Sequence, residues 1–104
     1  MNRDELKNAA VDGRVFWQRH SLERMLERGI ARKHVIETLT GGEVIEDYPE
    51  ATPFPSALLL GFFHDAPLHV VAGLDIESRH AFVITAYVPD LEHFEPGFRK
   101  RRTT

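Results

Sequence analysis

The sequence predicts an α+β domain in which two to three N-terminal helices precede a four-stranded antiparallel sheet. Apolar residues recur at helical spacing up to about residue 40, and after Gly41-Gly42 the pattern changes to β-branched and aromatic runs separated by turn residues. The 104 residues include no Cys and suffice for one core. A single domain over 1–104 is therefore expected, with its core at about 14–90 and a basic C-terminal tail at 99–104.

The first part of the chain is expected to hold three helices. Apolar spacing and stop signals place them at Asp4–Val11, Gln18–Gly29 and Arg32–Thr40. The second is the most informative, because Leu22, Met25 and Leu26 share one face and Gly29 stands where a helix stops. Val15–Trp17 is interpreted as an apolar lead-in to this helix.

The second part is expected to form four strands, at Glu43–Tyr48, Ala57–His64, Leu68–Asp75 and His80–Val88. The last two turns are short, which favours antiparallel pairing, and the proline-rich segment Pro49–Ser56 should be a surface loop. The later strands are apolar on both faces. The second face must therefore be covered by the N-terminal helix, by Leu91–Phe98 or by another chain, which leaves room for a homodimer.

Charge is unevenly distributed along the chain. Residues 1–34 carry eight Lys/Arg and five Asp/Glu, residues 35–98 carry one and eleven, and residues 99–104 carry four and none, for a net charge of -3. An acidic chain argues against broad, non-specific nucleic-acid binding, but a basic helix or tail can still contact phosphates. The acidic middle suits a basic protein partner, and the basic end is otherwise a solvated tail.

Several classes of chemistry lack their motifs. The sequence has no Gly-rich phosphate loop, no His-x-His pair, no His-Glu-x-x-His helix and no nucleophile elbow, and its six His show no close metal-ligand spacing. No metal site and no cofactor are therefore expected. The longest apolar run, Ala57–Phe63, is too short to span a membrane, and the acidic start is unlike a signal peptide. A soluble cytoplasmic protein without membrane contact is expected.

His20, Arg24 and Arg28 form the first candidate site, because intervals of four place them on one face of the second helix. A His in the first helical turn has its pKa lowered by the helix dipole and stays neutral, as a general base requires. The two guanidinium groups are suited to hold a phosphodiester. The stripe therefore has the minimum set for metal-free RNA cleavage by the 2′-hydroxyl.

An ordinary explanation of this stripe stays open. Glu23 and Glu27 interleave with the arginines, so Glu–Arg pairs on a solvated face would also account for the charges. Ser21 is an alternative N-cap, which would leave His20 outside the helix.

His69, Thr85 and Tyr87 are polar residues inside apolar strands and form the second candidate site. Thr85 and Tyr87 share a face because strand side chains alternate. If Asp75 pairs with His80, regular pairing turns His69 to the opposite face, whereas one extra residue or a bulge would bring it opposite Thr85. His69 is then a general-acid candidate; otherwise it is a core His that donates to a backbone carbonyl.

The sequence resembles a bacterial family of proteins known as a domain of unknown function. The resemblance covers about residues 14–90 and rests on the strings His20–Ile30, Gly42–Pro49, Leu60-Gly61, Pro67–Val71 and Ile84–Asp90, together with Val35. Members of that family look like RelE/MqsR-type toxins and, more distantly, other nucleases of the barnase-EndoU-colicin-RelE fold. The resemblance implies a RelE-like arrangement of helices and sheet.

The resemblance also implies a function: a toxin of a type II toxin-antitoxin system that cleaves mRNA without metal and has a cognate antitoxin. His20 would take the 2′-hydroxyl proton, His69 or Tyr87 would protonate the leaving oxygen, and Arg24 and Arg28 would stabilise the phosphorane, with Thr85 binding phosphate. A catalytically silent protein-binding or regulatory module is the alternative, followed by a small-molecule-binding domain. The acidic composition, unusual for a RelE-type toxin, favours the silent module.

Overall fold

The computed structural model describes residues 1–103, which form three helices and one five-stranded sheet. The helices are α1 (Arg3–Val11), α2 (Arg19–Arg28) and α3 (Arg32–Gly41). The strands are β1 (Val15–Trp17), β2 (Glu43–Tyr48), β3 (Ser56–Phe63), β4 (Ala66–Asp75) and β5 (His80–Tyr87), in the sheet order β1-β5-β4-β3-β2. The predicted α+β class is confirmed.

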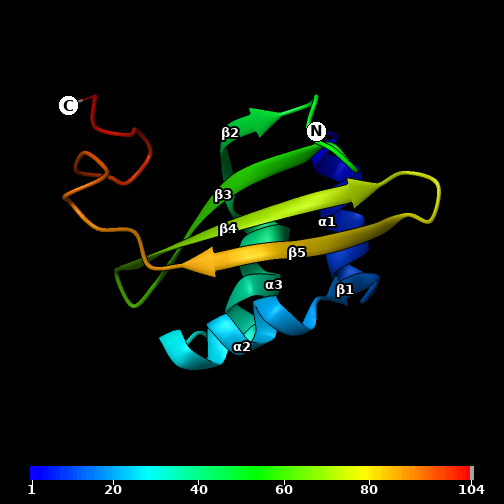
Figure 1. Cartoon of the computed structure of the whole chain (residues 1–104), viewed down its shortest axis with the longest axis horizontal. Coiled ribbons are helices and arrows are strands. Elements are labelled where there is room, and N and C mark those ends of the chain that lie inside the picture. The colour runs from blue at the N-terminus through cyan, green and yellow to red at the C-terminus, as the bar shows by residue number, and fades with distance from the viewer. Residues whose placement is uncertain (104) are drawn as a thin grey trace.

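The three helices lie near their predicted positions because their end signals work as expected. Asn2 caps α1, its side chain accepting a hydrogen bond from the Glu5 backbone N–H. Gly29 ends α2 with a φ of 69°, in the left-handed region that glycine adopts without strain. In Figure 1, α1 and α3 lie behind the sheet and α2 runs beside the β5 edge.

The predicted four-stranded antiparallel sheet is wrong in one respect. Val15–Trp17 is strand β1, which pairs in parallel with Ala81–Val83 of β5, so the sheet is mixed and five-stranded. Three residues are too few to show a two-residue alternation, and their partner strand lies at the other end of the domain sequence. The apolar lead-in was therefore indistinguishable from a short edge strand.

A bulge in β5 sets the faces of the last two strands. Asp75 pairs with His80 as expected, but Val71 pairs with Thr85 and Ala72 with Val83, so Ile84 is an extra residue. Beyond the bulge the residue opposite His69 is Tyr87 rather than Thr85. His69, Thr85 and Tyr87 consequently share one face of the sheet.

The helices cover the other face of the sheet and enclose the core. Buried core residues come from all three helices and from β3, β4 and β5: Leu6, Ala9, Ala10, Met25, Val35, Leu39, Ala57, Leu59, Leu68, Val70, Ala72, Ala81, Val83 and Ala86. Close approach of α3 to β3 depends on Gly61, where an added Cβ would lie 2.5 Å from the Thr38 hydroxyl oxygen.

The face that carries His69 is covered in part by residues 89–103, here called the C-terminal strap. Figure 1 shows the strap in orange to red at the end of the sheet where β5 stops. Phe94, only 2% exposed, packs edge-on against the His69 ring at a centroid distance of 4.6 Å. Arg99 pairs with Glu43 at 2.9 Å and Arg101 with Glu46 at 2.8 Å. Leu91–Phe98 is thus one of the predicted covering segments, and these two arginines are ion-paired with β2.

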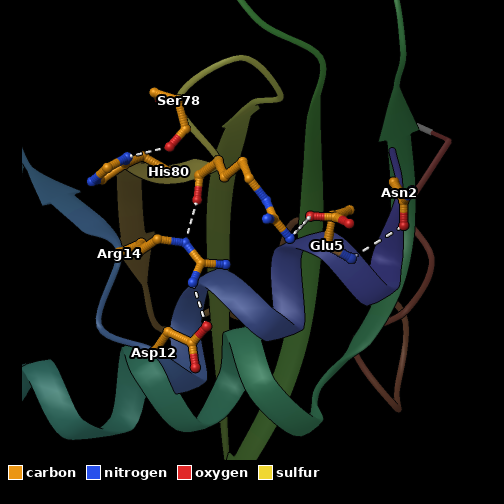
Figure 2. A network of polar contacts seen from close by, with 7 residues as sticks. Asn2, Glu5, Asp12, Arg14, Ser78 and His80 are labelled. Carbon is orange, nitrogen blue, oxygen red and sulfur yellow. Dashed lines mark hydrogen bonds and ion pairs between the residues drawn. The ribbon is translucent and has the colours of Figure 1, made fainter.

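A polar network ties the β4–β5 turn to α1 and to the start of β1 (Figure 2). The Arg79 guanidinium lies 3.6 Å from the Glu5 carboxylate, and Arg14 Nε donates to the Arg79 carbonyl at 2.9 Å. Arg14 also pairs with Asp12. The network holds the end of the β4–β5 hairpin against the N-terminal part of the chain.

We expect Gly61→Ala to lower the free energy of unfolding by about 1–3 kcal/mol, as overpacking of a core does. Thr38 is β-branched and its hydroxyl already donates to the His34 carbonyl at 2.8 Å, so it has little freedom to move. Gly41→Ala is the matched control, because an added Cβ there meets nothing within 4 Å. Urea unfolding of both variants checks this, and equal stabilities would contradict the packing.

Candidate functional site

Ser21 anchors α2 on the bulged part of β5. Its hydroxyl lies 3.0 Å from the Val83 carbonyl and 2.8 Å from the Ile84 carbonyl, so one donor serves two acceptors. The side chain is 2% exposed. Because Gln18 is the N-cap and Ser21 lies inside the helix, the alternative in which Ser21 caps α2 is wrong, and His20 stands in the first turn.

Arg28 joins the last turn of α2 to the other end of the bulge. Its Nη1 donates to the Ala86 carbonyl at 2.9 Å and lies 3.4 Å from the Thr85 hydroxyl. A guanidinium has five N–H donors, and Arg28 is exposed, so further donors remain for an anion. Arg28 and Thr85 therefore offer a cation and a hydroxyl where α2 meets the end of β5, and Tyr87 follows Thr85 on the same face of the sheet.

His69 is buried between Tyr87 and the strap. Its Nε2 is 2.8 Å from the Phe98 carbonyl, which only accepts, so Nε2 carries the proton and donates. In the neutral ring Nδ1 is then an acceptor, and the Tyr87 hydroxyl, 3.2 Å away, donates to it. His69 is 0% exposed. Donation to a backbone carbonyl is what the core-histidine alternative predicts, and burial keeps solvent from the ring.

Burial dominates the protonation of this pair. It lowers the pKa of His69, against the opposing effect of the Phe98 carbonyl; Arg101 lowers this pKa further and Glu46 raises it. Burial also raises the pKa of the Tyr87 phenol above its ordinary value. His69 is therefore held neutral and Tyr87 protonated near neutral pH.

His20 and Arg24 are exposed on α2. Within residues 1–103, neither side chain is hydrogen-bonded to His69, Thr85 or Tyr87. Arg24 pairs with Glu27 at 3.3 Å, an exposed ion pair of the kind that the solvated-face alternative predicts. Of the helical stripe, Arg28 is the residue that reaches β5.

Two features of the site were not predicted from the sequence. The sequence suggests Ser21 as an alternative cap, but its spacing of four from the apolar Met25 places both on the buried face of α2. The Phe98 carbonyl leaves no side-chain signal at all, because any residue supplies it. The signal for the role of Ser21 is a serine at an apolar position of the helical pattern.

One cluster of metal-ligand types occurs in residues 1–103, at Asp90, Glu92 and His93 of the strap. All three are exposed, and an Asp90 carboxylate oxygen accepts from the backbone N–H groups of Glu92 and His93 and from the His93 ring. The His93 contact lowers the pKa of Asp90. These contacts account for the cluster as a turn of the strap.

Comparison with known proteins identifies the family. A family model described as "Domain of unknown function (DUF4258)" matches residues 17–88, and the chain belongs to this family. The match extends from the end of β1 to just beyond β5, so it includes the site residues of α2, β4 and β5 but not Phe98 of the strap. No curated protein and no solved structure matches the chain.

The lowered pKa of His69 predicts a loss of stability in mild acid. The unfolded state, with a His pKa of about 6.5, binds the proton more tightly, so the free energy of unfolding falls as the pH drops below that value. Around the ring lie Tyr87 from β5, Glu46 from β2 and Arg101 from the strap. Burial alone would raise the pKa of Glu46, but hydrogen bonds from Arg101 and Tyr48 lower it overall. Glu46 therefore stays ionised in this pH range.

We expect urea unfolding to show a smaller free energy at pH 5.5 than at pH 7.5, and His69→Gln to flatten this difference because glutamine does not titrate. His64→Gln, at an exposed position of the β3–β4 turn, is the control and should keep it. An unchanged difference in His69→Gln would contradict the assignment.

Proposed function

We propose that this chain is a metal-independent endoribonuclease, the toxin of a type II toxin-antitoxin system, that acts on mRNA in the cytoplasm and has a RelE-like fold. The observation that carries the proposal is the placement of Arg28 at 3.4 Å from the Thr85 hydroxyl. A guanidinium with free donors beside a hydroxyl suits a phosphodiester. For residues 1–103, no helix is long and apolar enough to cross a membrane.

In the proposed reaction, His20 removes the proton from the 2′-hydroxyl, and the 2′-oxygen attacks the phosphorus. Arg24 and Arg28 stabilise the charge of the phosphorane, and the Thr85 hydroxyl donates to a phosphate oxygen. Tyr87 gives its proton to the departing 5′-oxygen and later regains one from the protonated His20 through solvent. The products are a 2′,3′-cyclic phosphate and a 5′-hydroxyl.

His69 takes a positioning role in this scheme, because its ring is buried and both nitrogens are engaged. Tyr87 is the proton donor in this scheme, because its raised pKa keeps the phenol protonated through the neutral range and His69 is fully buried. Before substrate binds, His69 accepts from the Tyr87 hydroxyl and holds it in place; in the proposed reaction this O–H turns from His69 to the departing oxygen.

His20→Ala is expected to lower RNA cleavage by about 10² to 10⁴ fold, the usual contribution of proton transfer, with an unchanged melting temperature. His93→Ala, at another exposed histidine, is the control and should leave the rate unchanged. The assay uses the purified chain and a labelled RNA in EDTA, with product ends mapped by mass spectrometry. Cleavage that needs a divalent ion, or ends other than 2′,3′-cyclic phosphates, would contradict the mechanism.

A protein-binding module remains the second candidate, and one observation favours it. On α2, Leu26 is 83% exposed. It borders a groove of about 620 Å³ whose apolar walls are Trp17, Leu22, Met25, Leu26 and Ile30. An exposed leucine beside an apolar groove is typical of a site for an amphipathic segment of another protein. In the proposed system the antitoxin would be that protein; in a silent module it would be a regulatory partner.

Leu26→Asp should therefore weaken binding of the protein encoded by the neighbouring gene by about ten-fold or more, because it places a charge at an apolar anchor. Folding should not change, since the side chain is already exposed. Val11→Asp, at a 63% exposed position on α1, is the control. Calorimetric titration gives both affinities, and equal affinities would remove the groove as the docking site.

A further inference from the structure

Four aromatic rings form a continuous row at the end of the sheet away from the strap. His80 of β5 stacks on Phe16 of β1 at 4.4 Å between ring centroids, Phe16 contacts Phe82 of β5 at 5.0 Å, and Phe82 stacks on Phe54 of the β2–β3 loop at 4.9 Å. Phe16 is 47% exposed. We call these residues the aromatic row; its rings belong to three separate segments of the chain.

A small cavity of about 200 Å³ opens beside the row. It is lined by Phe54, Phe82 and Ile84, with Gly73 on the strand beneath. Sites for drug-sized ligands occupy roughly 300–1,000 Å³, so this one suits a single planar ring system. Two of its walls, Phe54 and Phe82, are aromatic rings, the surface on which such a ring stacks.

Gln18 supplies a polar edge to the cavity. It is the N-cap of α2, yet its side chain makes no capping hydrogen bond, so the amide is not used to close the helix. A primary amide offers a donor and an acceptor side by side, as the edge of a nucleobase does. The hydroxyl of Ser56, also in the lining, already bonds to the Phe54 carbonyl at 3.0 Å.

The cavity lies on the same face of β5 as Thr85 of the candidate site. Phe82 lies opposite Gly73 and Thr85 opposite Val71, so both face the same side as His69. Their partners Gly73 and Val71 are two residues apart on β4, so Phe82 lies about 7 Å from Thr85 along the sheet. A strand bound at Arg28 and Thr85 can therefore lay a neighbouring base at the aromatic row.

From this geometry we infer that the cavity binds one unpaired nucleobase of a single-stranded RNA, next to the phosphodiester held by Arg28. The inference rests on the proposed function and adds to it a subsite that selects single-stranded substrate. Stacking on aromatic side chains combined with a hydrogen bond to the base edge is how proteins hold unpaired RNA bases.

The row is held in place before a base arrives. His80 Nδ1 donates to the Ser78 carbonyl at 2.8 Å, which fixes its ring against Phe16. Figure 2 shows this contact beside the Arg14 network that anchors the same turn to α1. Because the rings are already ordered, binding a base requires little further ordering of the protein.

The test measures affinity without turnover. The full chain with His20→Ala is titrated with a fluorescent 2′-O-methyl RNA hexamer and with six hexamers that each lack one base. Gln18→Ala and Phe54→Leu are made in this background. Phe62→Leu, at a 48% exposed phenylalanine of β3 outside the row, is the matched control. Melting curves show whether each variant is folded, and Gln18→Ala keeps the test valid if Phe54→Leu is not.

We expect Phe54→Leu and Gln18→Ala to weaken binding of the complete hexamer by about five- to thirty-fold, the lower part of the range for loss of one stacked base. One of the six hexamers that lack a base should bind the His20→Ala chain more weakly by a similar factor. Adding Phe54→Leu or Gln18→Ala should not weaken the binding of that hexamer further. In Phe62→Leu, removal of that base should weaken binding as much as it does in the His20→Ala chain.

Additive losses, or equal losses in Phe62→Leu, would overturn the base site even if the chain with His20 intact cleaves RNA. Non-additive losses, together with no cleavage by the chain with His20 intact, would support the base site and overturn the proposed reaction. Failure of every hexamer to bind would overturn both.

Discussion

The extra residue in β5 is the constraint on which the site depends. Ile84 interrupts the regular pairing with β4, and two successive carbonyls, those of Val83 and Ile84, are met by the Ser21 hydroxyl of α2. Buried carbonyls without a donor are costly, so α2 is held against this strand. Beyond the bulge the same insertion turns Thr85 and Tyr87 to the face of His69. One backbone irregularity thus positions both the helix and the strand side chains.

The ends of the chain neutralise much of the acidic strand β2. Glu43 pairs with Arg99, Glu46 with Arg101, and Asp47 with the N-terminal ammonium group at 3.1 Å. The sheet order places β2 at one edge and β1 at the other. The acids of β2 therefore lie at the edge opposite to α2. The acidic composition therefore does not by itself oppose an anionic ligand at Arg28, and it gives less reason to expect a basic protein along β2.

Much of this architecture could be predicted, because long segments carry clear periodicity. The three helices and four of the five strands follow from it, as does the need to cover a second sheet face. The three-residue β1 was missed because its order comes from pairing with Ala81–Val83 and not from local pattern. Regular pairing of Asp75 with His80 predicts the wrong face for His69, and no residue type announces the bulge that corrects it. The burial of His69 was equally hidden, since the strap holds it through a backbone carbonyl.

The central claim is that RNA lies along β5 beside α2. The most direct measurement is an NMR titration of the ¹⁵N-labelled full chain carrying His20→Ala with a 2′-O-methyl RNA hexamer. The account predicts that the largest amide shifts fall in β5 from Phe82 to Tyr87 and in α2, with β2 unchanged. Shifts confined to β2, or no shifts at saturating RNA, would contradict it.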